Sequence, residues 1–133
     1  MNEPNWLEKN ELLASHAELL AWFGGLSGLR DEGLLDSALH SPRQRWCYES
    51  PSLVELATAY ASAVVRNYPF VDGNKRAGFM AAYTFLGANG LELTAPEVEV
   101  VERTLALAAS AIEESDYAAF LAEYTAPVED EAK

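Results

Sequence analysis

One stretch, residues 68–76, reads YPFVDGNKR and brings together residue types that could bind phosphate at the start of a helix. The N-terminus of a helix offers unpaired N–H donors and a positive partial charge, both of which favour anions. Gly73 permits close approach of the backbone to a ligand. The side chains of Asn74, Lys75 and Arg76 add donors beside it. We therefore interpret the stretch as an anion site, with phosphate as the natural guest.

Asp72 extends this interpretation to a metal ion. A carboxylate repels a bare phosphate, but Mg²⁺ takes one or two carboxylates together with phosphate oxygens. The stretch thus suggests binding of a magnesium-bound nucleotide. The same residues also have ordinary structural explanations, because Asp or Asn before a helix is usually a cap and Gly usually serves a turn. From the residue types alone, both interpretations stay open.

The segments before this stretch predict helices. Residues 6–23 carry apolar side chains at helical spacing and end at a pair of glycines. A short helix is expected from Gly33 up to Pro42, because the residue before a proline avoids helical dihedral angles. Another helix is expected over residues 52–66.

The segments after the stretch predict three more helices. The alanine-rich residues 75–88 are expected to form the central and most buried helix of the fold. The Thr-x-x-Glu spacing that begins at Thr94 predicts a capping box for a helix over about 96–109. A last helix is expected to be capped by Ser115 or Asp116.

The chain as a whole is therefore predicted to be all-α, with about six helices around a buried central helix. No segment alternates apolar and polar residues as a strand would, and the chain shows no repeat. We expect one compact domain over residues 1–125, followed by a frayed acidic tail over residues 126–133.

Composition narrows the classes of function. The chain has 133 residues, half of them apolar, and its 21 acidic and 9 basic residues give a formal net charge of −12. Such a charge disfavours direct binding of nucleic acid. A single cysteine, Cys47, excludes an intrachain disulfide and a cysteine-cluster metal site. With no basic-then-apolar start and no run of about 18 apolar residues, we expect no membrane span and a cytosolic protein.

The string YPFVDGNKR resembles the signature loop of the Fic/Doc family, written His-x-Phe-x-Asp/Glu-Gly/Ala-Asn-Gly/Lys-Arg. The likeness extends to GLRDEGLLDSAL and FLGANGLEL and covers most of residues 10–125. It implies a helical domain that binds ATP and Mg²⁺, with Phe70 anchoring the loop in the core and Asp72 at the metal. The residues it implies at the nucleotide phosphates are Gly73, Asn74, Lys75 and Arg76.

Two positions resemble the Doc branch of the family. Lys75 stands where adenylyl-transferring members have Gly, and Phe79 stands where they have a second arginine. The Doc branch implies a toxin of a type II toxin–antitoxin system. Its implied reaction moves the γ-phosphate of ATP to a hydroxyl of a protein target of the translation elongation factor Tu class, with position 68, Lys75 and Arg76 as the catalytic group. Adenylyl transfer stays as the alternative.

Tyr68 occupies the position of the family's catalytic histidine. That histidine acts as a general base, and its value lies in a pKa near neutrality. A phenol with the ordinary pKa of about 10 is only roughly 0.1% ionised at pH 7. We therefore expect the chain as written to be inactive or nearly so. Two explanations stay open: a deliberately inactivated variant, or a natural homologue that keeps nucleotide or partner binding without transfer.

Regulation is expected from a partner. Many family members carry an inhibitory helix with the pattern Ser/Thr-x-x-x-Glu followed by Gly or Asn. The nearest match here runs from Ser110 to Glu114, but Ser115 follows and the pattern fails. The resemblance then implies inhibition in trans by an antitoxin, whose C-terminal segment folds into a groove on this domain.

Four further polar residues lie outside the loop of residues 68–76. His16 is expected to be packed, and His40 to interact with carbonyls at a helix end. Arg66 is expected either to reach phosphate or to cap a helix. Arg30, beside Asp31, lies in a region resembling the one from which the family's substrate-docking flap comes, and we expect it to be solvated.

Overall fold

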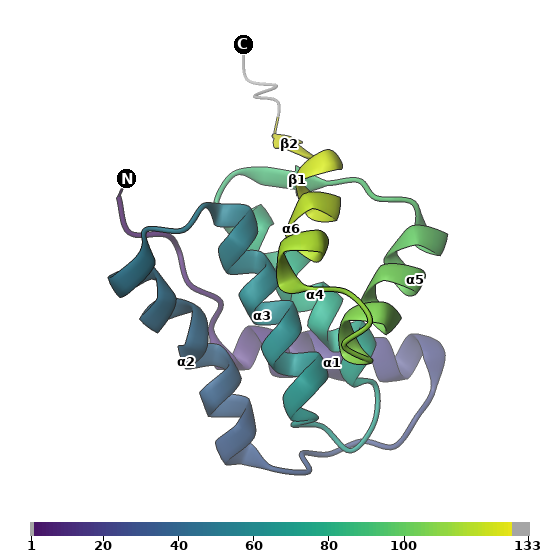
Figure 1. The fold of residues 1–133 in the computed structure, drawn as a ribbon. Coiled ribbons are helices and arrows are strands. Elements are labelled where there is room, and N and C mark those ends of the chain that lie inside the picture. Colours follow the sequence, from purple (N-terminus) through teal and green to yellow (C-terminus); the bar gives the residue numbers. More distant parts are fainter. Residues whose placement is uncertain (1, 129–133) are drawn as a thin grey trace.

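Six helices and one small sheet make up the fold of this chain, seen in a computed structural model that describes residues 2–128 (Figure 1). The predicted all-α class is confirmed. In chain order the elements are α1 (Lys9–Phe23), α2 (Glu32–Glu49), α3 (Leu53–Asn67), α4 (Asn74–Ala88), β1 (Leu91–Leu93), α5 (Glu97–Ala108), α6 (Glu114–Glu123) and β2 (Thr125–Pro127). None of the helices within residues 2–128 is both long enough and apolar enough to cross a membrane.

The central helix is α3, which contacts α2, α4, α5 and α6 (Figure 1). Its sequence, rich in alanine and valine, buries side chains on every side of the helix. The prediction that residues 75–88 form the most buried helix is wrong, because α4 leaves one flank at the surface, where Tyr83 is exposed. The close packing of α3 against α4 requires the glycine at position 78 of α4, because a Cβ at Gly78 would lie 2.6 Å from Cγ1 of Val65.

The helix that begins near Gly33 does not stop before Pro42. Instead α2 continues to Glu49, and the ring of Pro42 is buried within it. A proline inside a helix removes one backbone hydrogen bond. The continuation brings Trp46 edge-on to Trp6, with ring centroids 6.1 Å apart, and both indoles pack against the core. Tertiary packing therefore outweighs the local preference.

Three helix starts differ from the sequence prediction. The first helix begins at Lys9 rather than residue 6, with Glu8 and Glu11 forming a capping box. No capping box forms at Thr94, whose N–H donates to the carbonyl of Tyr124 at 2.9 Å and so joins the sheet region to the end of α6. The last helix is capped by Glu113, so neither Ser115 nor Asp116 is its cap, although the Asp116 carboxylate accepts from the Glu113 N–H at 2.9 Å.

The two strands are antiparallel and pair Leu93 with Thr125. Strands of three residues leave no readable alternation, which is why the sequence did not predict them. The expected boundary between domain and frayed tail, at residue 126, falls inside β2. Beyond the strand, the N–H of Val128 donates to the carbonyl of Gly90 at 2.9 Å. The rest of the expected tail, residues 129–133, lies outside the described residues.

Candidate functional site

The loop between α3 and α4 turns sharply at both ends. Tyr68 ends α3 in the left-handed conformation, with φ 51° and ψ 53°, and its side chain is 43% exposed. Gly73 precedes α4 with φ 77°. A positive φ favours glycine over residues with a side chain. The glycine of the stretch thus has a backbone reason, and it leaves the first N–H groups of α4 open to a ligand.

Asn74 holds the loop together from inside. Its Oδ1 accepts from the N–H of Phe70, and its Nδ2 donates to the carbonyl of Phe70, both at 2.9 Å. The side chain of Asn74 is buried, so the amide is committed to the loop rather than directed at a phosphate. Only its backbone N–H, at the start of α4, remains for a ligand. The Phe70 ring is 1% exposed, which is the arrangement of a loop anchor.

His16, on α1, contacts the loop from the side of the core. Its ring is 5% exposed and stacks on that of Phe70, with centroids 3.7 Å apart and planes 10° from parallel. Its Nε2 lies 2.7 Å from the carbonyl oxygen of Asp72, which can only accept, so Nε2 donates. The histidine is packed, as expected, and its partner is the loop that carries the candidate chemistry.

The Asp72 carboxylate points back at the segment that follows α1. It accepts from the N–H of Gly73 at 2.9 Å and from that of Leu26 at 3.2 Å. Gly25 makes this approach possible, because a Cβ there would lie 2.8 Å from Oδ2 of Asp72. Asp72 is exposed, so its carboxylate remains within reach of a ligand in solution.

A cavity of about 580 Å³ opens beside the start of α4. Its polar end is formed by Asp72, Gly73, Lys75 and Arg76, and its far wall is mostly apolar, although Glu97 and Thr104 also line the cavity. That wall comes from α1, α4 and α5 and includes Phe23, Phe79, Met80, Tyr83, Val101 and Leu105. The cavity therefore combines a cationic helix start with a long apolar surface.

Lys75 and Arg76 are exposed, and neither forms an ion pair with a carboxylate of residues 2–128. The Arg76 guanidinium lies 4.2 Å from the centre of the Phe23 ring, a cation–π contact. Arg30 and Arg103 also form no ion pair within residues 2–128, so what distinguishes Lys75 and Arg76 is that the two cations are adjacent at one helix start in a chain of net charge −12.

Arg30 is exposed, as expected, and its side chain also has definite hydrogen-bond partners. Its Nε donates to the carbonyl of Tyr68 at 2.6 Å, and its Nη2 donates to that of Asn67 at 2.7 Å. This contact could not be predicted from the sequence, because it joins residues that are 37 and 38 positions apart. The only available signal was an arginine directly before Asp31, whose side chain caps α2.

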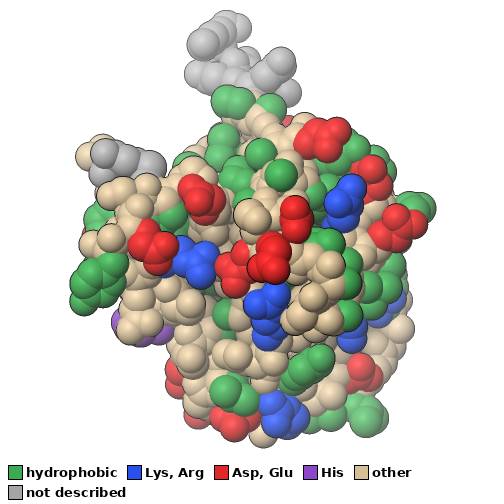
Figure 2. Space-filling view, viewed as in Figure 1, with side chains coloured by type: hydrophobic (Ala, Val, Ile, Leu, Met, Phe, Trp, Pro, Cys, Tyr) green, Lys and Arg blue, Asp and Glu red, His purple; other side chains and the backbone are tan. Residues whose placement is uncertain are grey.

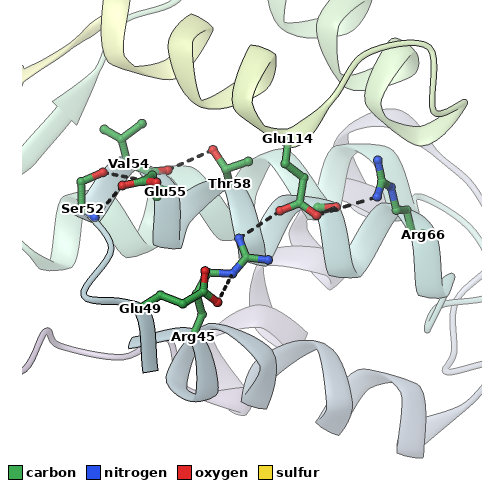
Figure 3. A network of polar contacts seen from close by, with 9 residues as sticks. Arg45, Glu49, Ser52, Val54, Glu55, Thr58, Arg66 and Glu114 are labelled. Carbon is green, nitrogen blue, oxygen red and sulfur yellow. Dashed lines mark hydrogen bonds and ion pairs between the residues drawn. The ribbon is translucent and has the colours of Figure 1, made fainter. Parts of the chain in front are cut away.

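Arg66 neither reaches the cavity beside α4 nor caps its own helix. Its Nη1 lies 3.8 Å from Glu114, which also takes Arg45 at 3.0 Å, so the Glu114 carboxylate lies between two arginines (Figure 3). The hydroxyl of Ser62 donates to the same carboxylate at 3.0 Å. This network ties α6 to α2 and α3. His40 is exposed in the middle of α2, away from any helix end.

Charges on the face of the molecule that carries this network are mixed. Figure 2 shows lysine and arginine side chains lying next to carboxylates rather than gathered into a basic patch.

Comparison with known proteins identifies the family. The Fic/DOC family matches residues 6–86. Toxin Doc of Mycolicibacterium smegmatis is 45% identical over 76 residues, which cover 55% of this chain and 58% of that protein. Protein kinase doc of Escherichia phage P1 is 32% identical over 88 residues, which cover 65% of this chain and 70% of that protein. The match thus spans less than two thirds of Toxin Doc, but the family match includes the whole loop and α4 up to residue 86. The chain belongs to the Fic/Doc family, as a Doc-type member.

Proposed function

We propose that this chain is the toxin of a type II toxin–antitoxin pair, with the architecture of an enzyme that transfers the γ-phosphate of ATP to a protein hydroxyl. The observation that carries the proposal is the pair of cations, Lys75 and Arg76, without carboxylate partners in the described chain, beside Asp72 and Gly73 at one end of the cavity. The names Toxin Doc and Protein kinase doc support the toxin and the kinase parts respectively. The proposed target is a translation factor of the elongation factor Tu class.

The start of α4 is the proposed phosphate site. The N–H groups of Asn74, Lys75 and Arg76 are the first of the helix and lack partners within it, whereas Ala77 already donates to Gly73 at 2.9 Å. The two side-chain cations add charge to these donors. The apolar wall beyond them suits the less polar part of a nucleotide.

Asp72 is the proposed magnesium ligand. Within residues 2–128 no group of three or more carboxylate, histidine or cysteine side chains is placed to hold a metal. One accessible carboxylate fits Mg²⁺ that takes its other oxygens from phosphates and water. When bound, such an ion neutralises charge on the phosphates. In this proposal the role of Asp72 is to hold the ion beside Lys75 and Arg76 of α4.

Tyr68 decides the activity of the chain as written. In the proposed reaction the side chain at this position removes the proton of the acceptor hydroxyl, and a phenol does this poorly at neutral pH. The exposed side chain leaves room for contact with a protein target. We therefore propose a chain that keeps the nucleotide site and transfers little or no phosphate.

The antitoxin is the proposed inhibitor. Glu114, the nearest counterpart of an inhibitory glutamate, is committed to Arg45 and Ser62. Inhibition from within the chain by this residue would break both contacts. The apolar wall of the cavity, where Val101 and Leu105 are about half exposed, supports docking of an apolar segment supplied by a partner.

A transfer assay with two labels tests the proposal. The chain as written, Tyr68→His and Tyr68→Phe are each incubated with elongation factor Tu, Mg²⁺ and either γ-labelled or α-labelled ATP. We expect γ-label on the target from Tyr68→His alone, at least about a hundredfold above the chain as written, in line with the usual contribution of a general base. The phenylalanine variant is the matched control, because it removes the hydroxyl and keeps the ring.

Other outcomes separate the alternatives. Transfer of α-label by Tyr68→His identifies an adenylyl transferase and overturns the kinase reaction. If no variant transfers either label while calorimetry shows bound ATP, the chain is a nucleotide-binding module or has another target. Equal γ-transfer by the chain as written and by Tyr68→His contradicts the role given to position 68.

A further inference from the structure

Arg30 joins the end of α3 to the segment of residues 24–31 that follows α1. Its guanidinium donates to two successive carbonyls, those of Asn67 and Tyr68, at 2.7 and 2.6 Å. The last carbonyls of a helix lack partners within the helix and carry the negative end of its dipole, so a cation is favoured there. The planar fork of an arginine can reach two neighbouring acceptors at once, whereas the ammonium of a lysine is a single point.

The backbone on either side of Arg30 is fixed to the same loop. The N–H groups of Arg30 and Asp31 both donate to the carbonyl of Pro69, at 2.7 and 3.1 Å. The N–H of Val71 donates to the carbonyl of Gly28 at 3.0 Å. The backbone of Arg30 is therefore already fixed, so that binding the end of α3 costs only the rotamer freedom of its side chain.

Tyr68 needs such support. A bulky residue at φ 51° is an outlier, and this one also precedes a proline, which restricts its backbone further. Conformations of this kind persist only where the surroundings impose them. The N–H of Tyr68 donates to Val64 at 3.2 Å, and Arg30 holds its carbonyl. Both backbone polar groups of residue 68 are thus hydrogen-bonded, and the backbone conformation that they fix sets the direction of its side chain.

We propose that Arg30 is a positioning residue for the side chain at position 68. By binding the carbonyls of Asn67 and Tyr68 it keeps residue 68 left-handed and fixes where the side chain of that residue points. The inference rests on the proposed function only in the task given to that side chain, which is proton removal from the acceptor hydroxyl. The contacts that define the role of Arg30 are all with the backbone.

The conformational part is tested without any activity. In the chain as written, the coupling between the amide and α protons of residue 68 and its carbon chemical shifts report φ by NMR. We expect Arg30→Lys to abolish the left-handed signature and to speed hydrogen exchange of the Tyr68 N–H by about tenfold or more. Arg43→Lys, a change at another arginine of the same region of sequence, should leave both unchanged. A left-handed signature that survives in Arg30→Lys overturns the proposal.

The catalytic consequence is tested in the Tyr68→His background. Adding Arg30→Lys should lower kcat for γ-phosphate transfer by about tenfold to a hundredfold, with KM for ATP within about twofold, because the start of α4 is untouched. All assays are run well below the melting temperature of each variant, so that loss of folded protein does not contribute. An unchanged kcat, despite an altered conformation at residue 68, refutes the positioning role. A Tyr68→His variant that transfers nothing contradicts the proposed function, and the NMR result then decides the role of Arg30 alone.

Discussion

Arg76 rests on an aromatic ring that belongs to a different helix. The Phe23 ring, at the end of α1, lies 4.2 Å from the guanidinium and lines the same cavity. A cation–π contact at an exposed site contributes about 0.5–1 kcal/mol. We predict that Phe23→Leu, which removes the ring and keeps an apolar side chain, weakens ATP binding by about twofold to fivefold. Calorimetric titration of the chain as written with Mg-ATP measures this change.

Phe23→Tyr is the control, because it keeps the ring and should bind ATP as the unchanged chain does. In an Arg76→Ala background the Phe23→Leu change should have little further effect, since the two residues act as a pair. Equal losses from Phe23→Leu with and without Arg76 would show that the phenylalanine acts by itself, as part of the apolar wall.

For single residues, the sequence predicted which side chains belong to the loop more readily than which residues they contact. The string of residues 68–76, together with the flanking segments, was sufficient to predict the family, because its types and order are specific. Phosphate binding by this loop stays a prediction. The commitment of the Asn74 amide to Phe70 and the contact of Arg30 with Tyr68 were not predicted. Both contacts depend on how residues 68–74 fold back on themselves and pack against residues 24–31. The neighbours of a residue in the sequence do not determine that packing.

Helix α4 contains two glycines that the structure distinguishes sharply. A Cβ on Gly78 would lie 2.6 Å from Cγ1 of Val65 and 3.1 Å from the carbonyl oxygen of Ala61, whereas a Cβ on Gly87 would meet nothing within 4 Å. We predict that Gly78→Ala lowers the free energy of unfolding by about 1–3 kcal/mol through overpacking. Gly87→Ala should raise it by up to about 1 kcal/mol, because alanine favours the helix. Urea unfolding of both variants measures the difference.

The same contact explains which element is central. An alanine-rich apolar segment suggests a buried helix, and residues 75–88 were therefore predicted to lie in the middle. Small residues in fact mark where two helices approach closely, and here they serve the contact of α4 with α3, the more enclosed of the two. Small residues therefore indicate a close contact between helices, but they do not indicate which of the two helices is the more enclosed. If Gly78→Ala and Gly87→Ala change stability equally, this account of the α3–α4 contact is wrong.

For the molecule as a whole, two buried tyrosines link the periphery to the core. The hydroxyl of Tyr60, on α3, accepts from the N–H of Leu7 at 3.1 Å and so holds the segment before α1. The hydroxyl of Tyr117, on α6, lies 2.8 Å from that of Thr104 on α5. Burial raises the pKa of Tyr60 and of Tyr117 to about 12, because the phenolate form would lose its hydration.

These shifts predict a loss of stability in alkali. Above pH 10 the unfolded chain releases phenolic protons that the folded chain still holds, so the free energy of unfolding falls as pH rises from about 10 to 12. Each tyrosine contributes up to about 2 kcal/mol to that loss. Urea unfolding at fixed pH values from 8 to 11.5 measures the slope of the free energy of unfolding against pH. The variant Tyr117→Phe should reduce this slope, because phenylalanine does not titrate.

The exposed Tyr48 gives the matched control, Tyr48→Phe, which should leave the slope as it is. A slope that is the same in all three chains would place the alkaline loss elsewhere, at groups such as Lys9, whose pKa is raised by its hydrogen bonds to Asp36 and Glu32.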